Sequence, residues 1–201
     1  MRALVFATTM EADPFDSALT EVAEKRWLSE DIWRYDYRDE GVLAAVVGMG
    51  MDASAAGMLH LLGAYHPSSV LNIGIAGALS DRVTIGGIYG VSRTVCWSGD
   101  SPEGYRLAPT PFFSLPNRTL VTSVTPVFDA ALRDEMARTG DMVDMEGAAI
   151  AEVCAHAAVP CAAIKGISDG AKDGDRETLR KNLTAVSERL AAVIVPRLFN
   201  R

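Results

Sequence analysis

The sequence predicts an α/β fold in which a central, mixed and twisted sheet lies between two layers of helices, as a three-layer single domain over residues 1–201. Short apolar runs rich in Val and Ile alternate with longer Ala-rich stretches of helical period, which is typical of a sheet covered by helices. A chain of 201 residues with 49% hydrophobic residues can bury one sizeable core and is short for two ordinary domains.

Six apolar runs fit strands, and most are continuous enough to be buried on both faces: Leu4 to Ala7, Leu43 to Val47, Val70 to Ile73, Gly87 to Val95, Leu120 to Val124 and Cys161 to Ile167. One antiparallel pair is expected, because Trp33, Tyr35 and Tyr37 alternate with polar residues and Asp39-Glu40-Gly41 can turn the chain. The sheet is therefore predicted to be mixed.

Four stretches have the length and the Ala, Leu, Glu and Arg content of helices: Asp52 to Tyr65, Pro126 to Thr139, Glu146 to Ala158 and Asp175 to Phe199. The Pro-rich segment from Ser101 to Asn117 is predicted to be a long loop between strands.

Composition excludes several classes of function. A net charge of −7 and a pI near 5.0 argue against nucleic acid as a partner, because phosphate backbones are held by clustered Lys and Arg. No run reaches the ~18 apolar residues of a membrane span, and the start of the chain lacks a secretory signal, so we expect a cytoplasmic protein without a membrane partner. The three cysteines show no metal-ligand spacing, and no metal or organic cofactor is expected.

Ligands of open α/β sheets collect beyond the carboxyl ends of the strands, so the polar residues that follow each apolar run are the candidates for a site. Glu11 follows the first run, where its simpler interpretation is an acidic residue at a helix start. Gly48-Met49-Gly50 and the segment Asn72 to Ala78 follow two further runs. A dinucleotide site would need an acidic residue where the chain has Asn72, so these glycines are interpreted as points of close backbone approach.

Two more carboxylates stand at such positions. Glu146 heads an apolar stripe formed with Ile150 and Val153, where a buried charge needs partners such as ribose hydroxyls or a helix N-terminus. The alternative interpretation of Glu146 is that it is simply a glutamate in the first turn of a helix. Asp169 follows the last buried run, in Ser168-Asp169-Gly170, where a turn or helix-capping role is the alternative to catalysis.

Taken together, these segments resemble the nucleoside phosphorylase and nucleosidase superfamily, particularly its bacterial 5′-methylthioadenosine/S-adenosylhomocysteine nucleosidase branch. Four motifs match in order along most of the chain: Thr9-Met10-Glu11, Gly74-Ile75-Ala76-Gly77-Ala78-Leu79, Asp144-Met145-Glu146-Gly147-Ala148-Ala149 and Ile167-Ser168-Asp169. The last two, with Val159-Pro160 between them, agree in order, spacing and flanking pattern.

The resemblance implies a role for each candidate. Asp169 would protonate N7 of a departing purine, and Glu11 would orient and deprotonate the attacking water. Glu146 and Met145 would hold the ribose, and Phe128 would stack on the base. Four further residues would contact the substrate: Ser168, Ala76, Gly77 and Asp144. The resemblance also implies a homodimer and a small-molecule purine nucleoside as ligand.

The residues favour water over phosphate as the nucleophile. Glu11 would oppose bound phosphate, and the first loop lacks a Gly-rich backbone cradle for an anion. We therefore expect hydrolysis of the N-glycosidic bond of a 5′-modified purine nucleoside. A phosphorylase of the same fold and a non-catalytic nucleotide-binding protein are the alternatives.

The substrate is left open between two types. One is methylthioadenosine or adenosylhomocysteine. The other is futalosine, because the segment Lys172-Asp173-Gly174-Asp175-Arg176 is similar to futalosine hydrolases, relatives that act in menaquinone synthesis. Lys165 stands in a buried strand where relatives often carry Arg, and the sequence shows no partner for it.

Overall fold

The computed structural model describes residues 1–97, 104–109, 114–172 and 174–199. Within them, the chain forms five helices: α1 (Thr9–Thr20), α2 (Met51–Tyr65), α3 (Ala130–Met136), α4 (Gly147–His156) and α5 (Asp175–Leu198). The strands are β1 (Arg2–Phe6), β2 (Glu24–Trp27), β3 (Ile32–Tyr37), β4 (Glu40–Val46), β5 (Ser69–Ala78), β6 (Ile88–Cys96), β7 (Gly104–Arg106), β8 (Asn117–Thr122), β9 (Met142–Asp144) and β10 (Cys161–Asp169).

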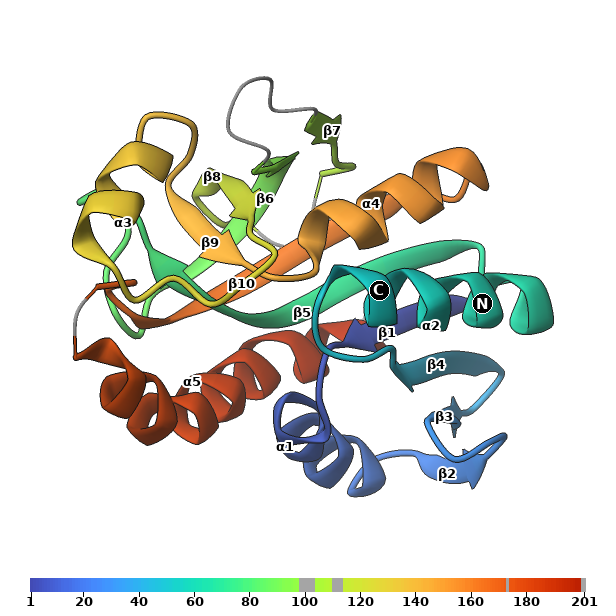
Figure 1. Cartoon of the computed structure of the whole chain (residues 1–201). Helices are drawn as coiled ribbons and strands as arrows, with labels where there is room; N and C mark the ends of the chain where they lie inside the picture. The colour runs from blue at the N-terminus through green and yellow to red at the C-terminus, as the bar shows by residue number, and fades with distance from the viewer. Residues whose placement is uncertain (98–103, 110–113, 173, 200–201) are drawn as a thin grey trace.

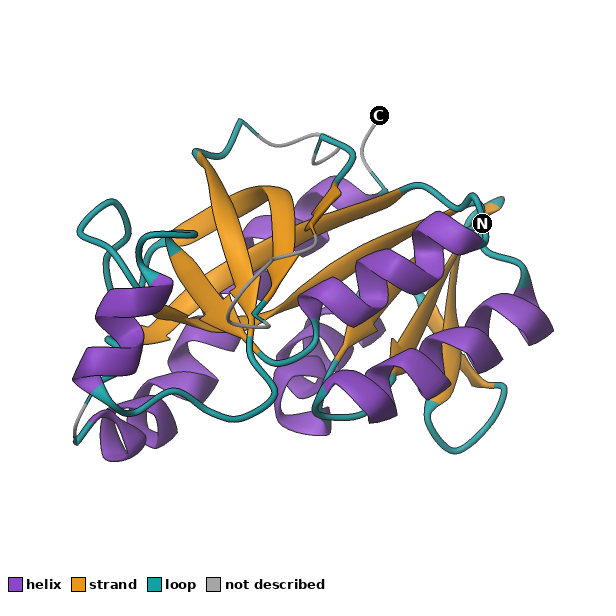
Figure 2. Ribbon diagram, turned by 45° about the horizontal axis from the view of Figure 1, so that its top comes forward, coloured by secondary structure: helices purple, strands orange, loops and turns teal. Residues whose placement is uncertain are grey.

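These strands form one mixed sheet in the order β10-β6-β8-β9-β5-β1-β4-β3-β2, with β7 beside β6. The mixed α/β architecture is confirmed. β5 also pairs with β10, so β5, β10, β6, β8 and β9 close into a ring that the sequence did not predict. The strong twist of the sheet is visible in Figure 2. The remaining strands, β1 to β4, extend from β5 as an open wing.

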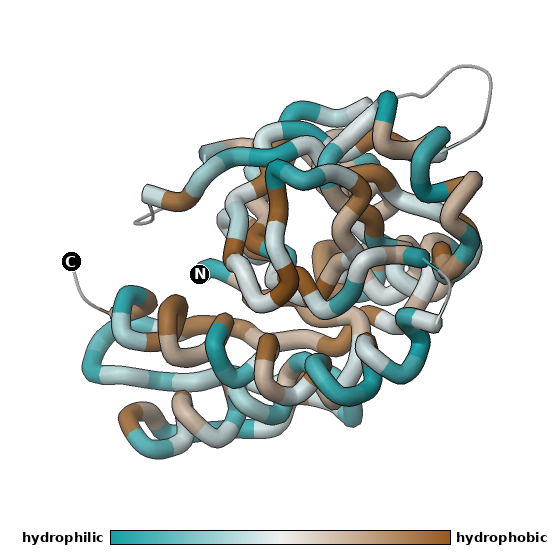
Figure 3. Tube along the Cα trace, turned by 90° about the vertical axis from the view of Figure 1, so that its left-hand side faces the viewer, coloured by the Kyte–Doolittle hydropathy of each residue, from teal (hydrophilic) through white to brown (hydrophobic). Residues whose placement is uncertain are grey.

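Helices cover both faces of this sheet (Figure 1). Successive side chains of β1 point to opposite faces of the sheet, as in any pleated strand. Leu4 and Phe6 pack with α1 and α5, whereas Ala3 and Val5 pack with α2 and α4. Apolar and polar residues interleave along the helical coils of the trace (Figure 3). None of the helices in the described part of the chain is long and apolar enough to span a bilayer.

Three predicted boundaries were wrong for identifiable reasons. The helix predicted from Pro126 to Thr139 begins only at Ala130, because Asp129 is its N-cap and accepts a hydrogen bond from the Leu132 N–H at 2.7 Å. The hairpin turn lies at Arg38 and Asp39, since Glu40 already pairs with Tyr37 across the two strands. The predicted loop from Ser101 to Asn117 contains β7 and the start of β8, and residues 101–103 and 110–113 lie outside the described residues.

Candidate active site

β5 brings the candidate segments together, because it pairs with three strands in turn. β1 accompanies it as far as Asn72, β9 joins it from Gly77, and β10 lies along its other edge, with Asp169 opposite Gly77. The chain segments that leave β1, β9 and β10 therefore meet around the second half of β5. Between Asn72 and Gly77, one edge of β5 faces neither β1 nor β9.

A cavity of about 380 Å³ lies at this meeting point. All nine residues predicted for the site line it: Glu11, Ala76, Gly77, Phe128, Asp144, Met145, Glu146, Ser168 and Asp169. They come from the segment after β1, from β5, from the loop before α3, from the β9–α4 junction and from the end of β10. Three carboxylates far apart in the sequence thus share one cavity with an aromatic ring.

The carboxylate of Glu11 fills the open edge of β5. Its Oε1 accepts the Ile75 backbone N–H at 2.9 Å, and its Oε2 accepts the backbone N–H and the hydroxyl of Thr8, both at 3.1 Å. The Thr8 side chain in turn accepts the Glu11 backbone N–H and caps α1. Glu11 therefore both lies in the first turn of the helix and lines the cavity. A carboxylate offers about four lone pairs. The three bonds from Ile75 and Thr8 leave capacity for about one further donor.

Glu146 is the N-cap of α4, and its side chain turns away from the helix. Its Oε1 accepts the Gly50 backbone N–H at 2.6 Å, so the Gly48-Met49-Gly50 segment approaches the cavity closely at Gly50. Gly50 has a φ of 86°, a conformation that favours glycine. Burial, and then the negative charge of Asp144, raises the pKa of Glu146 to about 7, against the opposing effects of Lys165 and Gly50.

Asp169 closes the opposite wall of the cavity. Its Oδ2 accepts the Ser168 hydroxyl at 2.7 Å, and its Oδ1 accepts the Ala171 N–H at 2.8 Å. Burial raises the pKa of Asp169 above the ordinary value, although both of these donors oppose the shift. A carboxyl group with a raised pKa keeps its proton at higher pH, which suits it to act as a proton donor.

A buried ion pair lies beside these carboxylates. The Lys165 ammonium contacts Oδ2 of Asp144 at 3.0 Å and also donates to the Asn72 side chain at 3.4 Å. Asp144 accepts further hydrogen bonds from the Thr122 hydroxyl and the Gly147 N–H. Burial alone would lower the pKa of Lys165, but the charges of Asp144, Glu11 and Glu146 together raise it. Lys165 is thus held as a cation within an acidic site.

Several cavity residues were not predicted as site residues. Met10 and Met49 line the cavity, as do four residues of α5: Arg176, Leu179, Arg180 and Leu183. The methionines are 56% and 66% exposed, and they lie within two segments that the sequence analysis named, Thr9-Met10-Glu11 and Gly48-Met49-Gly50. A surface helix carries many arginines, so the sequence held no signal that would place Arg180 at the cavity.

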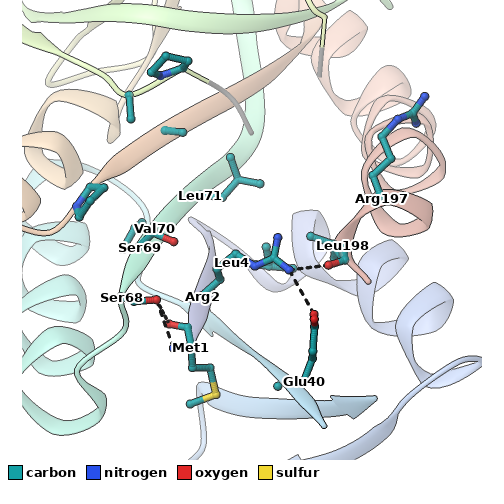
Figure 4. Close-up of a pocket in the computed structure, with 15 residues that line it drawn as sticks. Met1, Arg2, Leu4, Glu40, Ser68, Ser69, Val70, Leu71, Arg197 and Leu198 are labelled. Carbon is teal, nitrogen blue, oxygen red and sulfur yellow. Dashed lines mark hydrogen bonds and ion pairs between the residues drawn. The ribbon is translucent and has the colours of Figure 1, made fainter. Parts of the chain in front are cut away.

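A second, larger cavity of about 550 Å³ lies at the amino ends of β1, β5 and β10. Its polar groups bond to one another. Arg2 donates to the Leu198 carbonyl at 2.6 Å and lies 3.8 Å from Glu40, and Ser68 bonds Met1 (Figure 4). None of the predicted site residues lines it, and ligands of such sheets bind at the carboxyl ends. Among the described residues, no group of three or more His, Cys, Asp or Glu could hold a metal ion.

The fold matches solved structures along almost its whole length. 5′-Methylthioadenosine/S-adenosylhomocysteine nucleosidase from Helicobacter pylori superposes with a TM-score of 0.86 at 17% identity, over 97% of this chain and 96% of that chain. Futalosine hydrolase of Helicobacter pylori gives 0.86 at 17%, over 96% and 95%. S-Adenosylhomocysteine nucleosidase from Streptococcus pyogenes gives 0.80 at 19%, over 96% and 93%.

At these identities, the likeness to solved structures establishes the fold alone. The sequence itself gives a stronger result, because a family model described as the phosphorylase superfamily matches residues 2–139 and 115–198. The two matched segments together span nearly all of the chain. The protein therefore belongs to the phosphorylase superfamily.

Proposed function

We propose that the protein is a nucleosidase that hydrolyses the N-glycosidic bond of a 5′-modified purine nucleoside, of the methylthioadenosine/adenosylhomocysteine or the futalosine type. The observation that carries the proposal is the convergence of Glu11, Glu146 and Asp169 on one cavity. Loss of a purine leaves a ribose with oxocarbenium character. The reaction therefore needs a proton for the base, negative charge near the sugar and an activated water.

In this proposal, each carboxylate has one task. Water attacks C1′ while the bond from C1′ to N9 breaks. Asp169 gives its proton to N7 of the leaving purine, and Glu11 takes a proton from the water. The raised pKa of Asp169 and the remaining acceptor capacity of Glu11 suit these two roles.

The sugar and the base take up the rest of the cavity. Glu146 accepts hydrogen bonds from ribose hydroxyls, with Met145 packed against the sugar, and Phe128 stacks on the purine. Ala76, Gly77 and Ser168 form the wall beside the base. Asp144 supports the site from behind, because its oxygens are already bonded to Lys165, Thr122 and Gly147.

The negative charge of the cavity favours water over phosphate as the nucleophile. Glu11 and Glu146 are both buried at the cavity, at 6% and 7% exposure, and Lys165 is itself paired with Asp144. A phosphate ion at the ribose would meet like charges at short range, where repulsion amounts to about 4 kcal/mol for unit charges ~4 Å apart at an effective dielectric of ~20.

One assay tests the proposal. The protein is incubated with methylthioadenosine, adenosylhomocysteine, futalosine and inosine, with and without phosphate, in ¹⁸O-labelled water, and the sugar product is identified by mass spectrometry. We expect a free, ¹⁸O-labelled ribose derivative from at least one 5′-modified nucleoside without phosphate. Strict dependence on phosphate with formation of ribose 1-phosphate would identify a phosphorylase. No reaction with any of the four would refute the proposal.

The proposal also includes a homodimer and a cytoplasmic location, both from the family resemblance and the sequence. Sedimentation equilibrium of the purified protein tests the first, because a monomer at micromolar concentration would exclude it. Fractionation of the source cells tests the second.

A further inference from the structure

The mouth of the cavity differs in character from its interior. Inside stand the carboxylates of Glu11, Glu146 and Asp169. The mouth is apolar where Met10, Met49, Leu179 and Leu183 line it, and it is basic where Arg176 and Arg180 line it. A ligand that spans the cavity therefore passes from acidic surroundings, along apolar side chains, to two guanidinium groups.

Neither guanidinium has an ionic partner within the described residues. Arg176 lies over the Phe128 ring, 4.9 Å from its centroid, and no hydrogen bond or ion pair with another described residue holds Arg180. Several other arginines are engaged: Arg133 bonds the carbonyls of Ala78 and Gly170, and Arg34 pairs with Asp36. As far as the described residues go, the two arginines at the mouth thus have guanidinium N–H groups available to a ligand.

The two arginines lie on one face of α5. Arg176 is in the first turn of the helix, beside Asp175 and Glu177, and Arg180 follows four residues later. Side chains four residues apart on a helix are neighbours, so the two guanidinium groups can bind the same group of a ligand in the cavity that they line.

Resting on the proposed function, we propose that the substrate carries an apolar stem on its 5′ side that ends in an anion, and that Arg176 and Arg180 bind this anion. Guanidinium groups bind carboxylate and phosphate oxygens in a bidentate manner. The apolar mouth residues suit the stem. The interior carboxylates repel an anion, so the charge at the far end of the substrate also orients the nucleoside with its purine inward.

Matched substrates test this inference directly. The 5′-(3-carboxypropylthio) derivative of 5′-deoxyadenosine is compared with its primary amide, which has the same length and no charge, and both are repeated with hypoxanthine as the base. We expect kcat/KM to be about tenfold higher for the acid than for the amide, as for a charge-assisted hydrogen bond at a partly exposed site. Adenosine 5′-monophosphate forms a third arm, which separates a phosphate directly on C5′ from a carboxylate on a stem.

Variants then assign the preference to the arginines. R180Q is expected to reduce the ratio of kcat/KM for the acid to kcat/KM for the amide from about tenfold to less than about twofold. R180E should reverse the preference toward the 3-aminopropylthio analogue. K181Q removes the same charge from an exposed neighbour that does not line the cavity, and it should keep the preference.

The outcomes separate this inference from the proposed function. If the wild type cleaves the acid and the amide equally well, the nucleosidase assignment stands and the anion site is wrong. Equal losses on both substrates in R180Q would also refute the anion site, because they indicate a structural role. If none of the nucleosides is cleaved, the proposed function fails, and this inference fails with it.

Discussion

At the scale of single residues, Asp169 carries the sharpest prediction. Asp169→Asn keeps the shape of the side chain and removes the proton that the purine needs. We expect kcat to fall by at least ~10²–10⁴-fold, the usual contribution of a placed proton donor. The measurement is kcat on the best substrate from the assay above. Asp175→Asn is the matched control, because Asp175, the first residue of α5, accepts the N–H of Gly170 next to Asp169 but does not line the cavity.

Asp175→Asn keeps an oxygen acceptor for Gly170 and should cost less than about tenfold. Near-normal turnover by the Asp169→Asn protein would remove Asp169 from the mechanism.

Glu146 makes stability depend on pH. Its pKa is raised to about 7 in the folded protein, so the fold favours its protonated form. The unfolded chain releases this proton first as pH rises, and stability is therefore lost between about pH 4.5 and pH 7. We expect Glu146→Gln to remove this loss and to be more stable than wild type at pH 8 by roughly 2 kcal/mol, but not at pH 4.

Urea unfolding at pH 4 and at pH 8 measures this effect. Glu152→Gln on the same helix is the control, because Glu152 is only half-buried and does not line the cavity. The interpretation fails if wild type and Glu146→Gln lose stability in parallel over this range.

The sequence predicted which residues line the cavity better than it predicted their hydrogen-bond and ion-pair partners. Glu11, Glu146 and Asp169 could be found because each breaks an apolar pattern at the end of a strand or the start of a helix. The partners of Lys165 could not, since Asp144 and Asn72 reach it through the register of other strands. Pairing across a sheet depends on contacts distant in sequence, which local patterns do not encode.

At the scale of elements, a substitution of Gly74 on β5 tests how closely the sheet fixes the position of the Glu11 carboxylate. A Cβ at Gly74 would lie 2.6 Å from Oε1 of Glu11 and 3.2 Å from Nζ of Lys165. Gly74→Ala should push the Glu11 carboxylate from its place and lower kcat roughly tenfold to a hundredfold, while unfolding free energy falls by only about 1–3 kcal/mol. Full turnover would show that the position of Glu11 is not critical.

Gly63→Ala is the control for this substitution. Gly63 lies within α2, where a Cβ would meet nothing within 4 Å. The change should leave kcat unaltered and raise the free energy of unfolding by about 0.5–1 kcal/mol, because alanine favours helix over glycine. Urea unfolding and steady-state kinetics on both variants provide the comparison.

Helices and strands could be predicted from the sequence where their apolar residues form a long pattern and are buried in the structure. β10, α2 and α4 have such patterns, and the structure contains them close to the predicted bounds, whereas β5 continues to Ala78, beyond the predicted end at Ile73. β2 was missed because Glu24–Trp27 is charged and largely exposed at the edge of the sheet. β9 was missed because three residues are too few to show a period, yet this strand places Asp144 and Glu146.

At the scale of the whole molecule, the cavity joins the closed ring of strands to the open wing. Its walls include the end of the β1–α1 loop, β5, β9, the segment between β9 and α4, β10, and the helices α1 and α5. Under the proposed function, a bound nucleoside would contact elements from both parts of the sheet and would bind only the folded state. At a concentration 100 times its Kd, such a ligand stabilises the fold by about 2.7 kcal/mol, which raises the Tm of a domain of this size by roughly 5–10 °C.

A purine C-nucleoside tests this prediction without turnover, because its carbon–carbon glycosidic bond resists hydrolysis. We expect the Tm to rise with its concentration in the wild type and in Lys181→Gln, and to rise less in Glu146→Gln, where the ribose loses a charged acceptor. Ribose alone, added at the same concentrations, should give a small shift, because it leaves the region around Phe128 and Asp169 unfilled. An unchanged Tm at millimolar C-nucleoside would mean that this cavity does not bind a purine nucleoside, whatever reaction the three carboxylates support.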